Sequence, residues 1–278
     1  MIDPITTERL DAGGVTLLVE RRGPADGPLV FLHPGAGADH HALAPQTRFF
    51  RSMGFTTLCP DSRGLGGSDQ PAGGYDVPTM AGDARAVLDA YGQRRVLLVG
   101  QSLGSAICQE VALADPGRVR GLVLMATWAR TDPFLGLQMS LTQGIVRGAP
   151  PEVYARALLY LVVSRRYVGD GGAAFEGLVR GMFLGRRAPS REILLRHLAA
   201  GSSHDAAARL GSLDVPALVL SGERDLMIPA VYGEETASLL HKGRHVLMRG
   251  ERSSHLFHWE MAGEVEARLA AFVKDLPD

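Results

Sequence analysis

A serine between two glycines is the first feature of this chain that could do chemistry. The pentapeptide GQSLG at 100–104 follows an apolar run at 95–99 and precedes a stretch of small and apolar residues at 105–114. G-x-S-x-G between a strand and a helix is typical of a nucleophile elbow, a sharp turn that exposes the serine hydroxyl above a sheet edge. The serine also begins a helix, where free N–H groups favour a developing negative charge. We predict that Ser102 is a nucleophile; the alternative is an ordinary tight turn.

A serine nucleophile needs a base within hydrogen-bond reach, and the base needs a carboxylate that orients it. In an open parallel sheet such groups gather where strands end, so they are expected just past the predicted strands. Asp225 directly follows the apolar run at 215–220 and is the predicted acid. Glu223 is its local competitor, and Asp132, which follows the preceding strand, is a less favoured alternative.

The predicted base is His255, which lies just past a further strand at 244–248. His258, one helical turn later, is the alternative. The chain order serine, aspartate, histidine favours His255, because a triad built around this kind of elbow has that order. The other histidines are interpreted as ordinary polar residues, except His33, which is expected to brace its own loop.

Stabilising the oxyanion of an acyl-transfer reaction requires two backbone donors. The N–H of Leu103, directly after the nucleophile, is expected to be one of them. The second is expected from the loop that follows a short apolar strand at 29–32, from Gly35 or from Ala36. Pro34 has no N–H and is excluded.

The elements that must position these groups alternate along the chain. Short apolar strands and helices follow one another, which predicts an α/β fold with a mostly parallel sheet covered on both faces. The alternation stops at 132–204, where no strand is predicted. We expect a helical insertion there, with a core made of 1–131 and 205–278. Strands are predicted within 4–22 and at 29–32, 55–59, 95–99, 121–125, 215–220 and 244–248, and helices at 43–53, 79–91, 105–114, 134–146, 151–163, 173–184, 189–200 and 262–274.

Composition excludes several classes of protein. The 278 residues are 46% hydrophobic and 21% charged, with a formal net charge of -1 and no basic block, so neither nucleic acid nor a membrane surface is an expected partner. The two cysteines, Cys59 and Cys108, lie in apolar segments and predict buried free thiols, with no disulfide framework and no metal spacing. The N-terminal residues lack a signal-peptide pattern, so a cytoplasmic location is expected. The sequence leaves the oligomeric state open, a homodimer included.

Several segments together resemble the α/β-hydrolase fold family, in particular its cap-bearing branch of small-molecule esterases and lactonases. They are the segment LHPG at 32–35, the loop DSRGLGGSD at 61–69, the elbow, the aspartate with Pro229, and the histidine with Glu260. The resemblance implies a helical cap after the sixth strand and a serine acyl-transfer mechanism without metal or organic cofactor. It also implies the roles given above for the serine, the histidine, the aspartate and the oxyanion loop. Pro34 stands where the family usually has glycine, and Gln101 stands where histidine is common.

The insertion is expected to cover Ser102 as a lid and to help form the substrate site. Trp128, at the exit of a strand, is the aromatic residue most expected to contact a small-molecule substrate, and His33 and Gln101 are further candidates. An apolar lid predicts a largely hydrophobic ester or lactone. The alternatives are hydrolysis of a carbon–carbon bond, perhydrolase or haloperoxidase-like chemistry, and a ligand-binding or non-hydrolytic biosynthetic member of the fold. Candidate lining residues are Leu135, Leu137, Met139, Leu158, Leu159, Met182 and Phe183, and Arg130, Arg165 and Arg166 could meet a substrate carboxylate.

Overall fold

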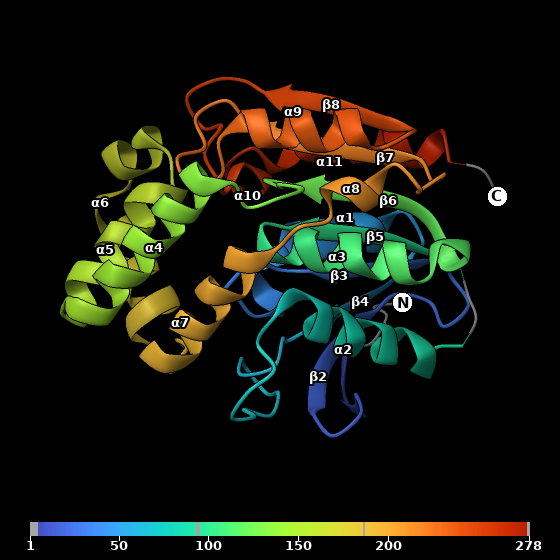
Figure 1. Cartoon of the computed structure of the whole chain (residues 1–278), viewed down its shortest axis with the longest axis horizontal. Coiled ribbons are helices and arrows are strands. Elements are labelled where there is room, and N and C mark those ends of the chain that lie inside the picture. Colours follow the sequence, from blue (N-terminus) through green and yellow to red (C-terminus); the bar gives the residue numbers. More distant parts are fainter. Residues whose placement is uncertain (1–4, 93–94, 186, 277–278) are drawn as a thin grey trace.

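A single mixed sheet forms the centre of the molecule, as the computed structural model shows (Figure 1). The structure describes residues 5–92, 95–185 and 187–276. Within these ranges the sheet has eight strands in the order β1-β2-β4-β3-β5-β6-β7-β8, antiparallel from β1 to β4 and parallel from there on. The strands are β1 (Thr6–Asp11), β2 (Thr16–Arg22), β3 (Leu29–His33), β4 (Thr56–Pro60), β5 (Val96–Gln101), β6 (Val119–Met125), β7 (Ala217–Gly222) and β8 (Gly243–Met248).

Helices cover both faces of this sheet, so successive residues of a central strand enter different cores. In β5, Val96 and Leu98 belong to one apolar cluster, while Leu97 and Val99 belong to the other. This explains why the strand is a continuous apolar run rather than an alternating one. One face carries α2 (Val77–Ala90), α3 (Leu103–Ala114), α8 (Ala207–Leu210) and α9 (Ala230–Leu239), and the other carries α1 (Ala44–Ser52) and α11 (Ala262–Lys274), with the short α10 (Phe257–Glu260) beside them.

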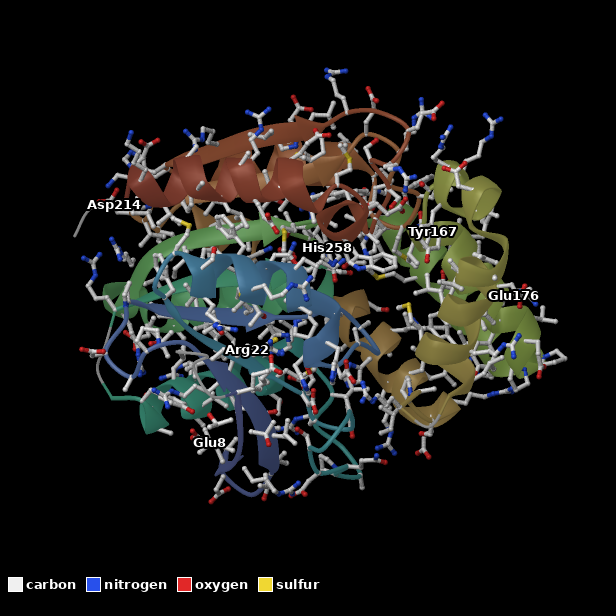
Figure 2. The ribbon with its side chains drawn as sticks, turned by 180° about the vertical axis from the view of Figure 1, so that it is seen from behind. Glu8, Arg22, Tyr167, Glu176, Asp214 and His258 are labelled. Atoms are coloured by element: carbon white, nitrogen blue, oxygen red, sulfur yellow. The ribbon has the colours of Figure 1, made fainter. Side chains whose placement is uncertain are left out.

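The segment between β6 and β7 is helical and lies beyond the carboxyl ends of the parallel strands (Figure 1). It has an apolar cluster of its own, centred on Val146, Tyr154 and Leu159. Seen from the back of the molecule, Glu176 projects from the outer edge of this segment, whereas His258 lies in the interior (Figure 2). The elements are α4 (Pro133–Gly148), α5 (Pro151–Val162), α6 (Arg165–Val179), a π-helical turn (Arg180–Leu184) and α7 (Arg191–Ala200).

One of the expected helices differs from the sequence prediction. Instead of spanning 173–184, α6 begins at Arg165, where Ser164 caps it by accepting a hydrogen bond from the N–H of Tyr167. The backbone leaves helical geometry at Gly172, inside a glycine-rich stretch that hid the helix from pattern analysis. Within the described ranges, none of the helices has the length and apolarity needed to cross a bilayer.

Candidate active site

The backbone of Ser102 is held in a conformation that few residues other than glycine adopt. Its φ is 53° and its ψ is -122°, a strain that costs about 1–3 kcal/mol and is concentrated at functional sites. The strained turn is fixed because the N–H of Ser102 donates to the carbonyl of Met125 on β6 at 2.9 Å. A Cβ at Gly104 would lie 2.1 Å from the carbonyl oxygen of His33, and one at Gly100 would lie 2.4 Å from the carbonyl oxygen of Gly104. Both glycines of the motif are therefore required by the close approach of helix and strands.

The predicted acid and base lie against each other, 30 residues apart in sequence. Nδ1 of His255 is 2.8 Å from Oδ2 of Asp225, and both side chains are buried. The other carboxylate oxygen, Oδ1, accepts the N–H groups of Met227 and Ile228, each at 2.8 Å. A carboxylate opposite Nδ1 can only accept, so in a neutral imidazole at this position Nδ1 carries the hydrogen and Nε2 presents its lone pair. This is the tautomer that a general base toward serine requires.

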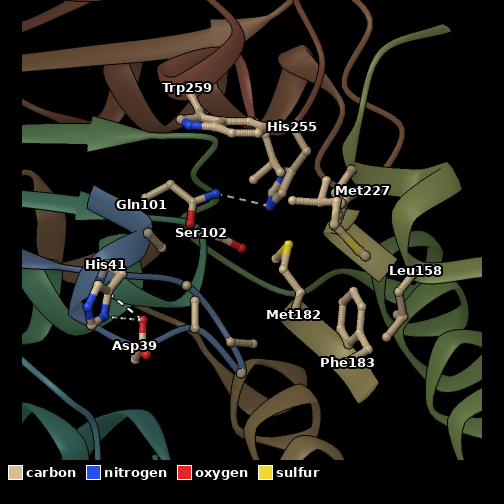
Figure 3. Close-up of a pocket in the computed structure, with 18 of the residues that line it drawn as sticks. Asp39, His41, Gln101, Ser102, Leu158, Met182, Phe183, Met227, His255 and Trp259 are labelled. Carbon is tan, nitrogen blue, oxygen red and sulfur yellow. Dashed lines mark hydrogen bonds and ion pairs between the residues drawn. The ribbon is translucent and has the colours of Figure 1, made fainter. Parts of the chain in front are cut away.

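Gln101 is the neighbour of this lone pair. Its Nε2 lies 3.3 Å from Nε2 of His255 (Figure 3). No hydrogen bond between Ser102 Oγ and His255 occurs in the part of the chain that the structure describes, although the two residues line the same cavity. Gln101 lines that cavity as well, and its place beside a substrate stays a prediction.

The three candidate oxyanion donors surround Ser102. Leu103 is the first residue of α3, so its N–H has no intrahelical acceptor. Gly35 and Ala36 line the cavity, and no acceptor for their N–H groups occurs among the described residues. A Cβ at Gly35 would lie 3.1 Å from Cβ of Ser102, so the loop backbone packs directly against Ser102. Both loop donors remain candidates on this geometry.

A buried aspartate holds the loop that carries these donors. Oδ1 of Asp61 accepts the N–H of His40 at 3.0 Å and contacts Nδ1 of the same residue at 2.7 Å, while Oδ2 accepts the N–H of Gly67. Burial alone would raise the pKa of Asp61, but the hydrogen bonds from His40 and Gly67 lower it. Burial acts to lower the pKa of His40, and the Asp61 carboxylate outweighs it, so this pKa is raised. The 61–69 segment therefore has a structural role that its sequence did not reveal.

The alternatives to the acid and the base have other partners. Glu223 pairs with Arg249 at 3.0 Å on the surface. Asp132 caps α4 by accepting the N–H of Leu135 at 2.8 Å and also accepts the hydroxyl of Tyr232. Burial, with a smaller contribution from His255, lowers the pKa of His258 to about 3, which keeps it neutral. Of the candidates for acid and base, the structure brings Asp225 and His255 together and places Glu223, Asp132 and His258 in other contacts.

A cavity of about 360 Å³ opens between the strand ends and the helices of the insertion, with Ser102 and His255 on its wall (Figure 3). Three of the predicted lining residues, Leu158, Met182 and Phe183, are on it. Of the other four, Leu135, Met139 and Leu159 are buried in packing, and Leu137 is exposed. Lining residues that the sequence did not identify include Asp39, His41, Val162, Leu178, Arg187, Leu194, Leu198, Met227, Leu256 and Trp259.

Two expected substrate contacts are corrected by the structure, because neither residue lines this cavity. Trp128 is 2% exposed, and its indole N–H donates to Oγ1 of Thr131 at 2.9 Å. Nδ1 of His33 lies 3.0 Å from the carbonyl of Pro34, and burial lowers the pKa of this histidine to about 4. His33 therefore braces its loop, as expected, and Trp128 packs where the chain enters the insertion.

The arginine of the cavity is not one of the three that the sequence suggested. Arg130, Arg165 and Arg166 lie away from the lining, whereas Arg187, in the connection to α7, is on it. Nη1 of Arg187 lies 3.2 Å from Nε2 of His41, and Nδ1 of His41 lies 3.2 Å from Oδ1 of Asp39. On this side of the cavity, the imidazole of His41 therefore links the guanidinium of Arg187 to the carboxyl group of Asp39.

Comparison with known proteins agrees with this fold. The family model described as alpha/beta hydrolase fold matches residues 28–158. A non-heme chloroperoxidase of Burkholderia pyrrocinia is 31% identical over 271 residues, which are 91% of this chain and 94% of that protein. The chain belongs to the α/β-hydrolase fold family. The predicted fold class and family resemblance are confirmed.

Other α/β-hydrolases are similar over most of their length. A protein of Azorhizobium caulinodans that is provisionally named carbamate hydrolase RutD is 30% identical over 204 residues, 73% of this chain and 76% of its own. Among solved structures, a hydrolase from Pseudomonas aeruginosa has a TM-score of 0.85 at 27% identity and covers 96% of this chain and 98% of its own. The chain is therefore an enzyme of the hydrolase class within this family.

Proposed function

We propose that this α/β-hydrolase cleaves a carboxylic ester or lactone of a small, largely hydrophobic molecule through an acyl-enzyme on Ser102. The observation that carries the proposal is the buried contact of 2.8 Å between His255 and Asp225, on a cavity that also holds the strained serine. The contact fixes the imidazole tautomer that can accept a proton from a serine hydroxyl.

Each group then has one task in the reaction. Ser102 Oγ attacks the substrate carbonyl, and its proton passes to Nε2 of His255. The N–H of Leu103 and one N–H of the Gly35–Ala36 pair donate to the oxyanion, where each donor is worth roughly a factor of 10²–10³ in kcat. His255 returns the proton to the leaving oxygen, which leaves an ester on Ser102. Water, deprotonated by His255, then releases the acid and restores the serine.

The lining of the cavity supports a hydrophobic substrate. Most of the side chains around Ser102 are apolar, among them Leu158, Met182 and Phe183 (Figure 3). The charged chain of Asp39, His41 and Arg187 borders only one side. Burial of an apolar acyl or alcohol group would supply roughly 25 cal/mol per Å² of apolar surface.

A haloperoxidase-like or perhydrolase reaction is the second candidate. In that reaction hydrogen peroxide replaces water as the nucleophile toward the acyl-enzyme, so the peroxide oxygen takes the acyl group and a peracid leaves. The chloroperoxidase of Burkholderia pyrrocinia, 31% identical, favours this candidate over carbon–carbon bond hydrolysis. The same serine, histidine and aspartate would serve both reactions.

The proposal is tested by the intact mass of the protein after incubation with a fluorophosphonate. We expect one phosphonyl adduct on the wild type and none on Ser102→Ala or His255→Ala. Ser140→Ala, on the exposed side of α4, is the matched control and should label like the wild type. Labelling of Ser102→Ala, or failure of the wild type to label even with a methyl-sized phosphonate, would refute the proposal. Assays with esters, lactones and acetate plus peroxide then separate the two candidate reactions.

A further inference from the structure

The side-chain amide of Gln101 contacts Nε2 of His255, the atom that accepts the proton of Ser102 in the proposed mechanism. Its Nε2 is 3.3 Å from Nε2 of His255, and both residues are 4% exposed. Gln101 ends β5, directly before the nucleophile, and its side chain lies on the cavity wall (Figure 3). The contact is therefore part of the site and not a surface encounter.

The chemistry of the two groups fixes the direction of this hydrogen bond. In the neutral imidazole that a general base requires, Nδ1 of His255 donates to Asp225, and Nε2 has a lone pair and accepts. Of the two ends of a glutamine amide, only the NH₂ group can donate. An imidazole nitrogen has one lone pair, so the N–H of Gln101 and the O–H of Ser102 compete for it. In the structure the glutamine has this position.

The position of Gly35 indicates what would move the amide. A Cβ at residue 35 would lie 2.5 Å from Oε1 of Gln101 and 3.1 Å from Cβ of Ser102, so the amide fills space between the oxyanion loop and the base. A carbonyl group bound to the N–H of Gly35 or Ala36 would therefore lie beside this amide. Substrate binding is expected to disturb the contact between Gln101 and His255.

We propose that Gln101 is a positioning residue that holds the imidazole of His255 while the cavity is empty and yields Nε2 to Ser102 when an acyl group binds. The proposal rests on the function proposed above. It adds that Gln101 determines when His255 is available as the base. Proton transfer is unchanged: the proton of Ser102 still passes to Nε2, after the N–H of Gln101 has left it. A small reagent that does not displace the amide should react slowly with the serine, whereas a good substrate should not.

Gln101→Met, which keeps the length of the side chain and removes the donor, tests this gate. Loss of one neutral hydrogen bond should raise the rate of phosphonylation by a methyl-sized fluorophosphonate roughly 2- to 12-fold. Gln143→Met is the matched control, because Gln143 donates to Ser202 outside the cavity lining. A Gln101→Met protein that phosphonylates at the wild-type rate or more slowly would overturn the proposal. Absence of any adduct on the wild type would instead overturn the proposed function.

A spectroscopic measurement tests the proposal even if Gln101→Met does not fold. The ¹⁵N shift of Nε2 in His255 reports whether its lone pair accepts a hydrogen bond. We expect Ser102→Ala to leave this shift in place, because Gln101 is the donor, and covalent phosphonylation of the wild type to change it. A shift that moves on Ser102→Ala, as it would if the serine were the resting donor, contradicts the assignment.

Discussion

Replacing Asp225 by asparagine gives the sharpest test of the catalytic geometry. Oδ1 of Asp225 accepts two N–H groups, from Met227 and Ile228, each at 2.8 Å, and Oδ2 accepts Nδ1–H of His255 at the same distance. An asparagine keeps its oxygen toward the two backbone donors, because turning it would leave two buried N–H groups facing an NH₂. The NH₂ group then faces Nδ1 of the histidine.

This reversal changes the tautomer of the base. Nδ1 must present a lone pair to the asparagine NH₂, so the hydrogen moves to Nε2, which can no longer accept the proton of Ser102. A triad with this defect loses a factor of about 10⁴ in kcat. The loss corresponds to about 5 kcal/mol of transition-state stabilisation. Folding should change little, since the substitution keeps the size of the side chain and its two backbone hydrogen bonds.

The assay is kcat for the best ester or lactone, together with the rate of phosphonylation, on Asp225→Asn and on Glu223→Gln. Glu223 lies in the same loop but contacts Arg249 and the N–H of Gly250 on the surface instead of the histidine, so Glu223→Gln should keep wild-type kcat. Circular dichroism and Tm verify that both variants fold. If folded Asp225→Asn retained more than a tenth of the wild-type kcat, the aspartate would not be the group that orients the base.

Three further predictions follow from the same structure. Gly35→Ala should lower kcat/KM by up to about 100-fold, because the new Cβ would lie 3.1 Å from Cβ of Ser102 and would push the loop away from the serine, whereas Gly148→Ala, with nothing within 4 Å of its Cβ, should keep the wild-type kcat/KM; steady-state kinetics decide between these outcomes. Trp128→Phe should lower Tm, because it removes the hydrogen bond to Thr131, and should leave KM unchanged. A raised KM at constant Tm would instead indicate that the tryptophan contacts the substrate. The free energy of unfolding should fall as the pH falls from about 6.5 toward 4. In this range four histidines bind protons in the unfolded chain but stay neutral when they are buried in the folded chain. Each of them lowers the free energy of unfolding by up to about 1.4 kcal/mol per pH unit. His40, whose pKa is raised, adds stability as the pH falls toward 6.5 and causes little further change below it, so an unchanged Tm between pH 6.5 and 4.5 would contradict the prediction. Burial lowers the pKa values of these four to about 4 for His33, His197 and His204 and to about 3 for His258.

The fold could be predicted from the sequence because strands and turns leave local signals. The apolar run at 95–99 needs cover on both faces, and the glycines around Ser102 mark the close approach of β5 and α3. Asp225 and His255 could be placed because strand ends in a parallel sheet share one edge. The boundaries of α6 could not, since glycines within the helix conceal both its period and its start.

Residues of the cavity were harder to predict, because burial and cavity lining have the same sequence signature. Trp128 and Met182 both occur in apolar segments near the insertion, yet only Met182 lines the cavity. Arg187 and His41 are 146 residues apart, and nothing local to either residue indicates their contact. The contact between Gln101 and His255 could not be predicted either, because it depends on the path of a loop that begins about 150 residues later.

The loop that carries the base shows why the insertion and the chemistry are physically linked. Glu260 accepts hydrogen bonds from the hydroxyl of Ser254, next to the base, and from the N–H and hydroxyl of Ser164, which caps α6. The N–H of Leu256 donates to the carbonyl of Val162 at the end of α5, at 3.0 Å. His255 is thus held from the sheet side by its aspartate and from the other side by the insertion. Both the orientation of His255 and the shape of the cavity therefore depend on the junction of α5 and α6, so this end of the insertion belongs to the framework of the proposed catalytic site.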